Sequence, residues 1–138
     1  MLKSTQELLH RLEDIDDIMK YLDENSGEII EETPESYLSC LLEIKGLKVA
    51  NVAQRSERGD YVYKVFQGKR KASREILLAI AIGMSMTVSE TQLLLRIART
   101  AQLDPRNQHD SVIIYALSNN LTVQKTNDIL YDVDEETL

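Results

Sequence analysis

The sequence predicts an all-α protein, and three features of its composition and pattern support this fold class. Residues that favour helix (Leu, Ile, Ala, Glu, Lys and Gln) dominate the 138 residues, which include only 2 Pro and 5 Gly. Apolar residues recur at helical spacing along most of the chain. No run of alternating β-branched residues is long enough to indicate a sheet. A chain of this length fits one domain, or one domain with an appended arm.

Residues 4–24 are expected to form an acidic amphipathic helix, with residues 28–33 as an acidic linker. Along this segment apolar residues are spaced by alternating steps of four and three, which is a heptad pattern. The residues of this seam are Leu8, Leu12, Ile15, Met19 and Leu22. The seam either packs against the rest of its own domain or forms the contact of a homodimer. We therefore expect residues 1–33 to form a segment of their own, an acidic helix followed by a linker.

The next three helices are expected at residues 34–45, 48–55 and 60–67. Thr33 is a favourable N-cap, and a proline at position 34 suits the first helical turn. Leu38, Leu41 and Leu42 are expected to point inward, and Cys40 is assigned to the core as well. Glycines follow two of these helices and provide their expected ends.

A helix at 74–84 follows, with Ser73 as its expected N-cap. From this helix an internal repeat with a period of 35 residues extends to residue 130. Residues 77–95 align without a gap on residues 112–130, and each copy reads as an apolar helix, a loop, a Thr cap and a second helix. The aligned caps are Thr87 and Thr122. Asp104-Pro105 breaks the chain between the copies. We therefore expect a domain over 34–103, and a C-terminal helical hairpin over 104–138 that packs on the same core and ends in a frayed acidic tail.

Charge is distributed very unevenly along this acidic chain, whose formal net charge is −7. Residues 37–74 hold nine of the sixteen Lys and Arg residues and three acidic residues, a net of +6. Residues 1–36 have a net charge of −8, and residues 75–138 a net charge of −5. An ordinary solvated surface mixes the two signs, so this separation indicates a surface for a polyanion. The acidic arm at 1–36 either competes with that polyanion or only improves solubility.

Other classes of function find little support in the sequence. The single Cys40 cannot form an internal disulfide, which fits a reducing, cytoplasmic setting. The two histidines, His10 and His109, do not show metal-ligand spacing, and no glycine-rich phosphate loop is present. No apolar stretch approaches the length of a membrane span. We therefore expect no enzyme activity, no metal or cofactor, and no membrane association.

The order of these elements resembles the phage-repressor-like (XRE-type) helix-turn-helix family. The resemblance covers about residues 34–98 and rests on Leu47, Val52-Ala53, Val62, Val65 and the Gly68–Lys71 loop followed by Ser73. It implies a bundle in which an alanine, here Ala53, lets the two helices of the pair pack closely. It also implies a bacterial or phage-like transcriptional regulator that binds duplex DNA as a homodimer.

The resemblance places a recognition helix at about 60–67 in the major groove, with the basic loop 69–71 on phosphates. Arg55 and Arg58 flank the turn and are candidates for backbone contacts. Tyr61 and Tyr63 are assigned either to DNA contact or to the edge of the core, and Lys64 and Gln67 to base contact or plain surface. The candidate DNA-binding residues are Arg55, Arg58, Asp60, Tyr61, Tyr63, Lys64, Gln67, Lys69, Arg70 and Lys71.

Some positions depart from the pattern of that family. Lys48 and Val49 occupy positions where the family has Ser or Thr and then Gln, and the turn is about one residue short. Base-reading positions fall on Gly59, which lacks a side chain, and Asp60, which repels phosphate. The alternative function is therefore a helix-turn-helix scaffold that acts as a protein interaction module without DNA binding.

Overall fold

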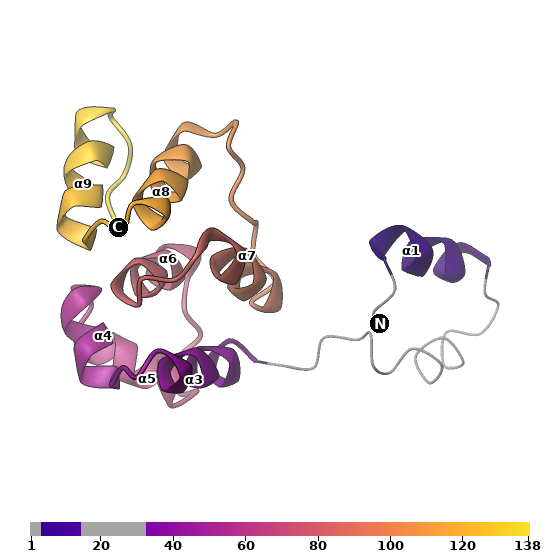
Figure 1. Ribbon diagram of the computed structural model, residues 1–138, viewed down its shortest axis with the longest axis horizontal. Coiled ribbons are helices and arrows are strands. Elements are labelled where there is room, and N and C mark those ends of the chain that lie inside the picture. Colours follow the sequence, from indigo (N-terminus) through magenta and orange to yellow (C-terminus); the bar gives the residue numbers. More distant parts are fainter. Residues whose placement is uncertain (1–3, 15–32) are drawn as a thin grey trace. The chain divides into compact units, whose positions relative to one another are not determined.

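The computed structural model describes residues 4–14 and 33–138, and the chain divides into two compact units, Met1–Glu31 and Glu32–Leu138 (Figure 1). In the first unit, helix α1 spans Thr5–Asp14. In this helix Leu8 is half-buried and Leu9 is exposed. Leu12 belongs to α1, whereas three further seam positions lie outside the described residues, namely Ile15, Met19 and Leu22. The dimer seam therefore stays a prediction.

The second unit consists of short helices joined by tight turns, and no strand occurs in the described parts of the chain, which confirms the all-α class. Its helices are α3 (Pro34–Ile44), α4 (Val49–Arg55), α5 (Asp60–Phe66), α6 (Arg74–Gly83), α7 (Val88–Ile97), α8 (Gln108–Ser118) and α9 (Val123–Asp132). None of the helices within 4–14 and 33–138 is long and apolar enough to cross a membrane.

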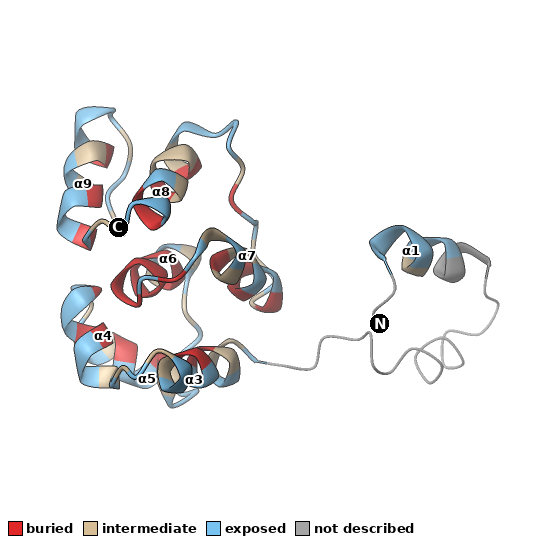
Figure 2. Cartoon of the chain, in the orientation of Figure 1, coloured by how far each residue is buried: buried red, intermediate tan, exposed pale blue. Residues whose placement is uncertain are grey.

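Helix α6 is the central element of the core, as its nearly continuous burial in Figure 2 shows. Every residue from Leu77 to Gly83 is buried, because α4, α7, α8 and α9 all pack against this helix. A Cβ atom on Gly83 would lie 3.0 Å from the backbone nitrogen of Ser56, which is tighter than an ordinary contact, so glycine suits this close approach to the end of α4. One apolar cluster extends from Leu38 to Leu130 and joins the predicted helix-turn-helix region to the C-terminal hairpin.

The helix starts follow the capping residues expected from the sequence. The Thr33 hydroxyl accepts from the Ser36 amide at 3.2 Å, and the Ser73 hydroxyl accepts from the Ile76 amide at 3.4 Å. The assignment of Cys40 to the core is wrong, because this side chain is exposed. Leu38 and Leu41 form the buried face of α3. Cys40 lies two residues after Leu38, a rotation of about 200° around the helix, so its side chain points away from that face.

The hairpins α6–α7 and α8–α9 repeat the same backbone geometry 35 residues apart. The turn between the helices contains a left-handed residue at Ser85 (φ 53°) and again at Asn120 (φ 51°). The second helix of each hairpin ends at a left-handed residue as well, Arg99 (φ 58°) and Asp134 (φ 61°). The period noted in the sequence is thus also a period of backbone conformation.

Side-chain hydrogen bonds to the backbone repeat with the same period. The buried Thr91 and Thr126 hydroxyls each donate to the carbonyl four residues earlier, both at 2.8 Å. The Gln92 side chain binds both backbone groups of the residue eleven positions later, Leu103, with its amide donor at 2.9 Å and its oxygen at 2.7 Å. Asn127 binds Leu138 in the same way, at 3.3 and 2.7 Å.

The C-terminal tail thus makes hydrogen bonds to the second unit, whereas the sequence predicted a frayed end. Besides the bonds between Asn127 and Leu138, the Gln108 amide donates to the Val133 carbonyl at 3.0 Å and to the Glu135 carboxylate at 3.1 Å. The acidic composition suggested fraying, but these bonds join amide side chains to backbone groups and, in one case, to the carboxylate of the acidic Glu135.

Candidate nucleic-acid interface

Helices α4 and α5 form a compact pair joined by a four-residue turn. Val52 and Ala53 of α4 are buried, as are Val62 and Val65 of α5. The buried Ser56 hydroxyl donates to the Ala53 carbonyl at 3.3 Å, which holds the turn against the end of α4. Gly59 then starts α5 with φ 52°, a value that suits glycine. The small Ala53 and this turn fix how closely the two helices approach.

The basic loop, residues 69–71, follows α5 and is held on one side by Tyr61. The Tyr61 hydroxyl donates to the Lys71 carbonyl at 3.3 Å, and the Arg70 guanidinium lies over the Tyr61 ring, 5.9 Å from its centre. Tyr61 is half-buried, so the structure places it at the edge of the core and against the loop. Its side chain holds Arg70 and Lys71 of the loop in place. The spacing of residues in the sequence did not indicate this role.

The other side chains that the sequence singled out lie on the outside of the pair. Arg58 is half-buried, and Tyr63 is 39% exposed. The other candidates are exposed as well, namely Arg55, Asp60, Lys64, Gln67, Lys69, Arg70 and Lys71. The exposed candidates therefore lie at the end of α4, on α5 or its C-terminal cap, and on the basic loop after it, which follow one another in the sequence.

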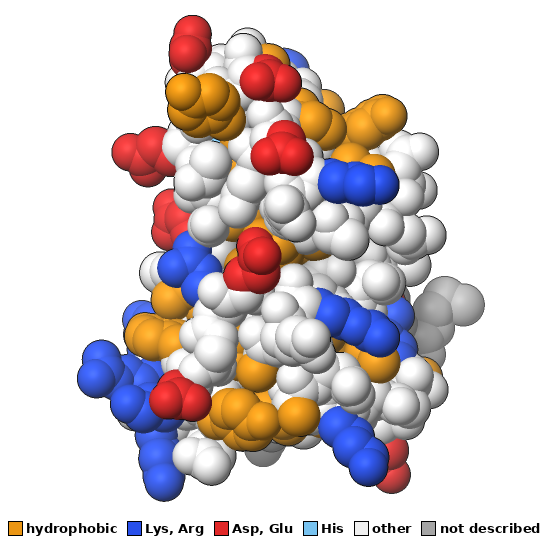
Figure 3. Space-filling view, turned by 90° about the vertical axis from the view of Figure 1, so that its left-hand side faces the viewer, with side chains coloured by type: hydrophobic (Ala, Val, Ile, Leu, Met, Phe, Trp, Pro, Cys, Tyr) orange, Lys and Arg blue, Asp and Glu red, His pale blue; other side chains and the backbone are white. Residues whose placement is uncertain are grey.

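Most of the cations in this segment form no ion pair with another residue that the structure describes. Of the nine Lys and Arg residues in 37–74, Lys45 pairs with Glu90 at 3.1 Å and Arg74 pairs with Asp110 at 2.9 Å. The seven others make no ion pair within the described residues, and in Figure 3 many of the Lys and Arg side chains gather over the lower part of the face shown. The seven are Lys48, Arg55, Arg58, Lys64, Lys69, Arg70 and Lys71.

The loop also offers backbone donors. The amides of Arg70, Lys71 and Ala72 donate to no acceptor in the described part of the chain. Successive free N–H groups beside cationic side chains are a common way to bind phosphate. The chemistry of this region is therefore that of anion binding through charge and backbone donors together.

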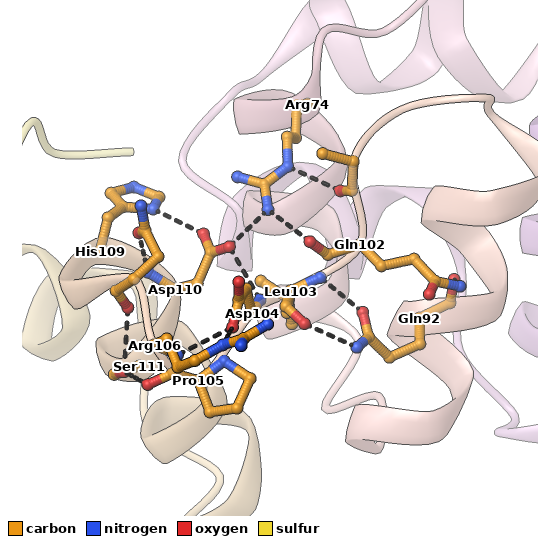
Figure 4. A network of polar contacts seen from close by, with 12 residues as sticks. Arg74, Gln92, Gln102, Leu103, Asp104, Pro105, Arg106, His109, Asp110 and Ser111 are labelled. Atoms are coloured by element: carbon orange, nitrogen blue, oxygen red, sulfur yellow. Dashed lines mark hydrogen bonds and ion pairs between the residues drawn. The ribbon is translucent and has the colours of Figure 1, made fainter.

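A polar network fixes the helix that follows the loop (Figure 4). Arg74, the first residue of α6, donates to the carbonyls of Ala101 at 2.9 Å and Gln102 at 3.3 Å, and to Asp110 at 2.9 Å. The Asp110 carboxylate also accepts from the Asp104 amide at 3.0 Å. In the sequence Arg74 counts as part of the basic block, whereas in the structure its guanidinium joins α6 to α8 and to the connector, residues 98–107 between α7 and α8.

Two carboxyl groups titrate abnormally for related reasons. Burial acts to raise the pKa of Asp110, but hydrogen bonds from Arg74 and the Asp104 amide outweigh it, so the pKa lies below its usual value. The pKa of Glu90 is also lowered, since bonds from the Thr87 amide and from Lys45 outweigh the effect of burial. Both groups belong to the scaffold of the unit. Among the residues described, no group of acidic, histidine or cysteine side chains has the arrangement of a metal site.

The chain has no match among family models, curated proteins or solved structures.

Proposed function

We propose that the chain binds duplex DNA through α4 and α5, as a regulator of transcription. The observation that supports this most is a set of seven cations in the α4–α5 segment and the loop after it, none of which has an ion-pair partner among the described residues. In this proposal α5 enters the major groove and the basic loop contacts phosphates on one side. Arg55 and Arg58 contact the backbone on the other side of α5.

Base recognition is proposed for Lys64 and Gln67, whose exposed side chains donate hydrogen bonds of the kind that purines accept. Asp60, exposed at the start of α5, is suited to accept from cytosine N4. Because α5 has only seven residues, one copy supplies few base contacts. We therefore propose that a homodimer binds two half-sites.

A protein interaction module is the second candidate, and Gly59 and Ile44 favour it. Gly59 presents no side chain where α5 begins, and Ile44 at the end of α3 is 74% exposed. An exposed aliphatic side chain suits a protein surface better than a phosphate backbone.

Fluorescence anisotropy of labelled duplex DNA, from about 50 to about 300 mM salt, distinguishes the two candidates, because phosphate binding weakens steeply with salt. We expect binding with a steep salt slope. Replacing Lys69, Arg70 and Lys71 by alanine should lower the affinity strongly and reduce that slope by up to about 3.

The matched control removes three other exposed cations, with Arg96, Arg106 and Lys125 replaced by alanine. This variant has the same net charge as the loop variant and should keep the wild-type slope. If the folded wild-type protein does not bind DNA at the lowest salt concentration, DNA binding is wrong. Equal loss in both triple variants would show only a nonspecific charge effect.

A further inference from the structure

A cavity of about 340 Å³ lies behind the basic loop, enclosed by the start of α3, the loop and the end of α7. Its volume falls at the lower end of the range for small-molecule sites. The floor is apolar, since Val65, Leu77 and Ile97 are all buried there. The cavity thus has an apolar base and an opening among polar groups, which is the usual build of a ligand pocket.

The polar wall of the cavity has an excess of positive charge. Arg70, Lys71 and Arg99 line it, against the single carboxylate of Glu35. None of these four side chains has an ion-pair partner within the described residues. Glu35 lies close to the loop turn, because a Cβ atom on Gly68 would be 3.3 Å from its Oε1 atom. A net of two unpaired positive charges beside an apolar floor calls for an anion with an apolar body.

We propose that this cavity binds a small molecule with a carboxylate or phosphate head and a short apolar chain, and that occupancy weakens DNA binding. The apolar chain would lie on Leu77 and Ile97, and the head would face Arg99 and the loop cations. The regulatory part of this proposal rests on the proposed DNA binding, because Arg70 and Lys71 serve both sites. A small anion bound to these cations competes with the DNA phosphates for the same positive charge. Each ligand therefore weakens the binding of the other by the same factor.

The binding part is tested by ¹H–¹⁵N NMR titration of the full chain with hexanoate and, separately, with hexyl phosphate. Two controls are titrated at the same ionic strength: acetate, which has the carboxylate head without the chain, and hexanol, which has the apolar chain without the charged head. We expect saturable shifts at the amides of Gly68, Ala72 and Arg99 with the two amphiphiles, and weak effects with acetate or hexanol. A response to only one amphiphile identifies the head group that the site prefers.

The variant Arg99→Asn removes a charge and keeps a residue type that tolerates the left-handed conformation at this position (φ 58°). It should weaken hexanoate binding about tenfold. Arg96→Asn, at an exposed position in the last turn of α7, is the control and should bind like the wild type. Ala98→Leu fills the cavity from its wall and should abolish binding, which gives a second variant if the first does not fold.

The regulatory part is tested by DNA anisotropy with hexanoate replacing chloride at constant ionic strength. DNA affinity should fall in the wild type and stay constant in Ala98→Leu. Localised NMR shifts without DNA binding would reject the proposed function and leave the cavity assignment intact. Unsaturable shifts spread over the surface, or equal shifts in Arg99→Asn and the wild type, would overturn the cavity assignment. Hexanoate binding that leaves DNA affinity unchanged would overturn the regulation.

Discussion

At the scale of single residues, Asp110 is a buried carboxylate that joins several parts of the second unit. Its side chain is 7% exposed and accepts from Arg74 and from the Asp104 amide, so one carboxylate joins α6, the connector and α8. A neutral side chain of the same shape at position 110 would fill the same volume but carry no negative charge. The Arg74 side chain, which is 21% exposed, would then lack its counter-charge.

We therefore expect Asp110→Asn to lower the free energy of unfolding by about 2–3 kcal/mol, because hydrogen bonds to charged groups are among the stronger ones. Urea unfolding followed by circular dichroism measures this difference. Asp128→Asn, an exposed position on α9, is the control and should change stability by less than about 0.5 kcal/mol. If the two variants have equal stability, Asp110 does not have the structural role assigned to it.

At the scale of elements, the two hairpins share a hydrogen-bond pattern but have different neighbours. Gly83 near the end of α6 meets the backbone of α4, whereas Ser118, the equivalent residue of α8, is exposed. In an exposed helix an alanine in place of glycine stabilises by about 0.5–1 kcal/mol. At Gly83 the new Cβ atom would lie 3.0 Å from Ser56 nitrogen and 3.3 Å from Arg55 carbonyl carbon, and neither backbone atom can move freely.

Steric overlap should outweigh helix propensity here, so Gly83→Ala is expected to destabilise the protein by about 1–3 kcal/mol. Ser118→Ala should be close to neutral, since it loses only an exposed bond to the Ile114 carbonyl. Thermal unfolding of both variants gives the comparison. A more stable Gly83→Ala variant would mean that α4 does not pack against α6 at this distance.

At the scale of the whole molecule, the two lowered pKa values set the direction of acid sensitivity. Asp110 and Glu90 have folded-state pKa values below their usual values of 3.8 and 4.5, so the unfolded chain binds protons more readily. Their contribution to stability is complete above these usual values and is lost as the pH falls through the folded-state values.

The free energy of unfolding should therefore decrease as the pH is lowered from about 6 to about 3. The double variant Asp110→Asn, Glu90→Gln lacks both carboxylates, so its smaller stability should change less over the same range. Urea titrations at several pH values measure both slopes. Identical slopes in the two proteins would assign the acid sensitivity to other carboxyl groups.

Much of the helical framework could be predicted from the sequence, because local signals determine it. Thr33, Ser73 and Thr87 cap helices as expected, and the 35-residue period appears in the backbone. The burial of Cys40 was mispredicted, because composition does not tell which side of a short helix faces the core. Non-local partners were missed as well, since Arg74 reads as one more cation until the fold brings Asp110 to it.

The sequence was sufficient to locate the candidate site as a basic segment, but not to predict how its side chains are arranged in space. Counting charges located residues 69–71, whereas the hydrogen bond from Tyr61 and the cavity behind the loop depend on residues that are distant in sequence. Arg99, which lines that cavity, lies well outside the basic block and had no signal in the sequence.

The repeated bonds of Gln92 and Asn127 have a consequence for the ancestry of the chain. Each side chain binds the backbone of the residue eleven positions later, so the bond depends on an amide at one position and on no particular partner. After duplication of an ancestral hairpin, mutations could accumulate in the apolar residues while these amides and the Thr91 and Thr126 hydroxyls were retained. Common descent of such hairpins would then be recorded mainly in side chains that bind backbone.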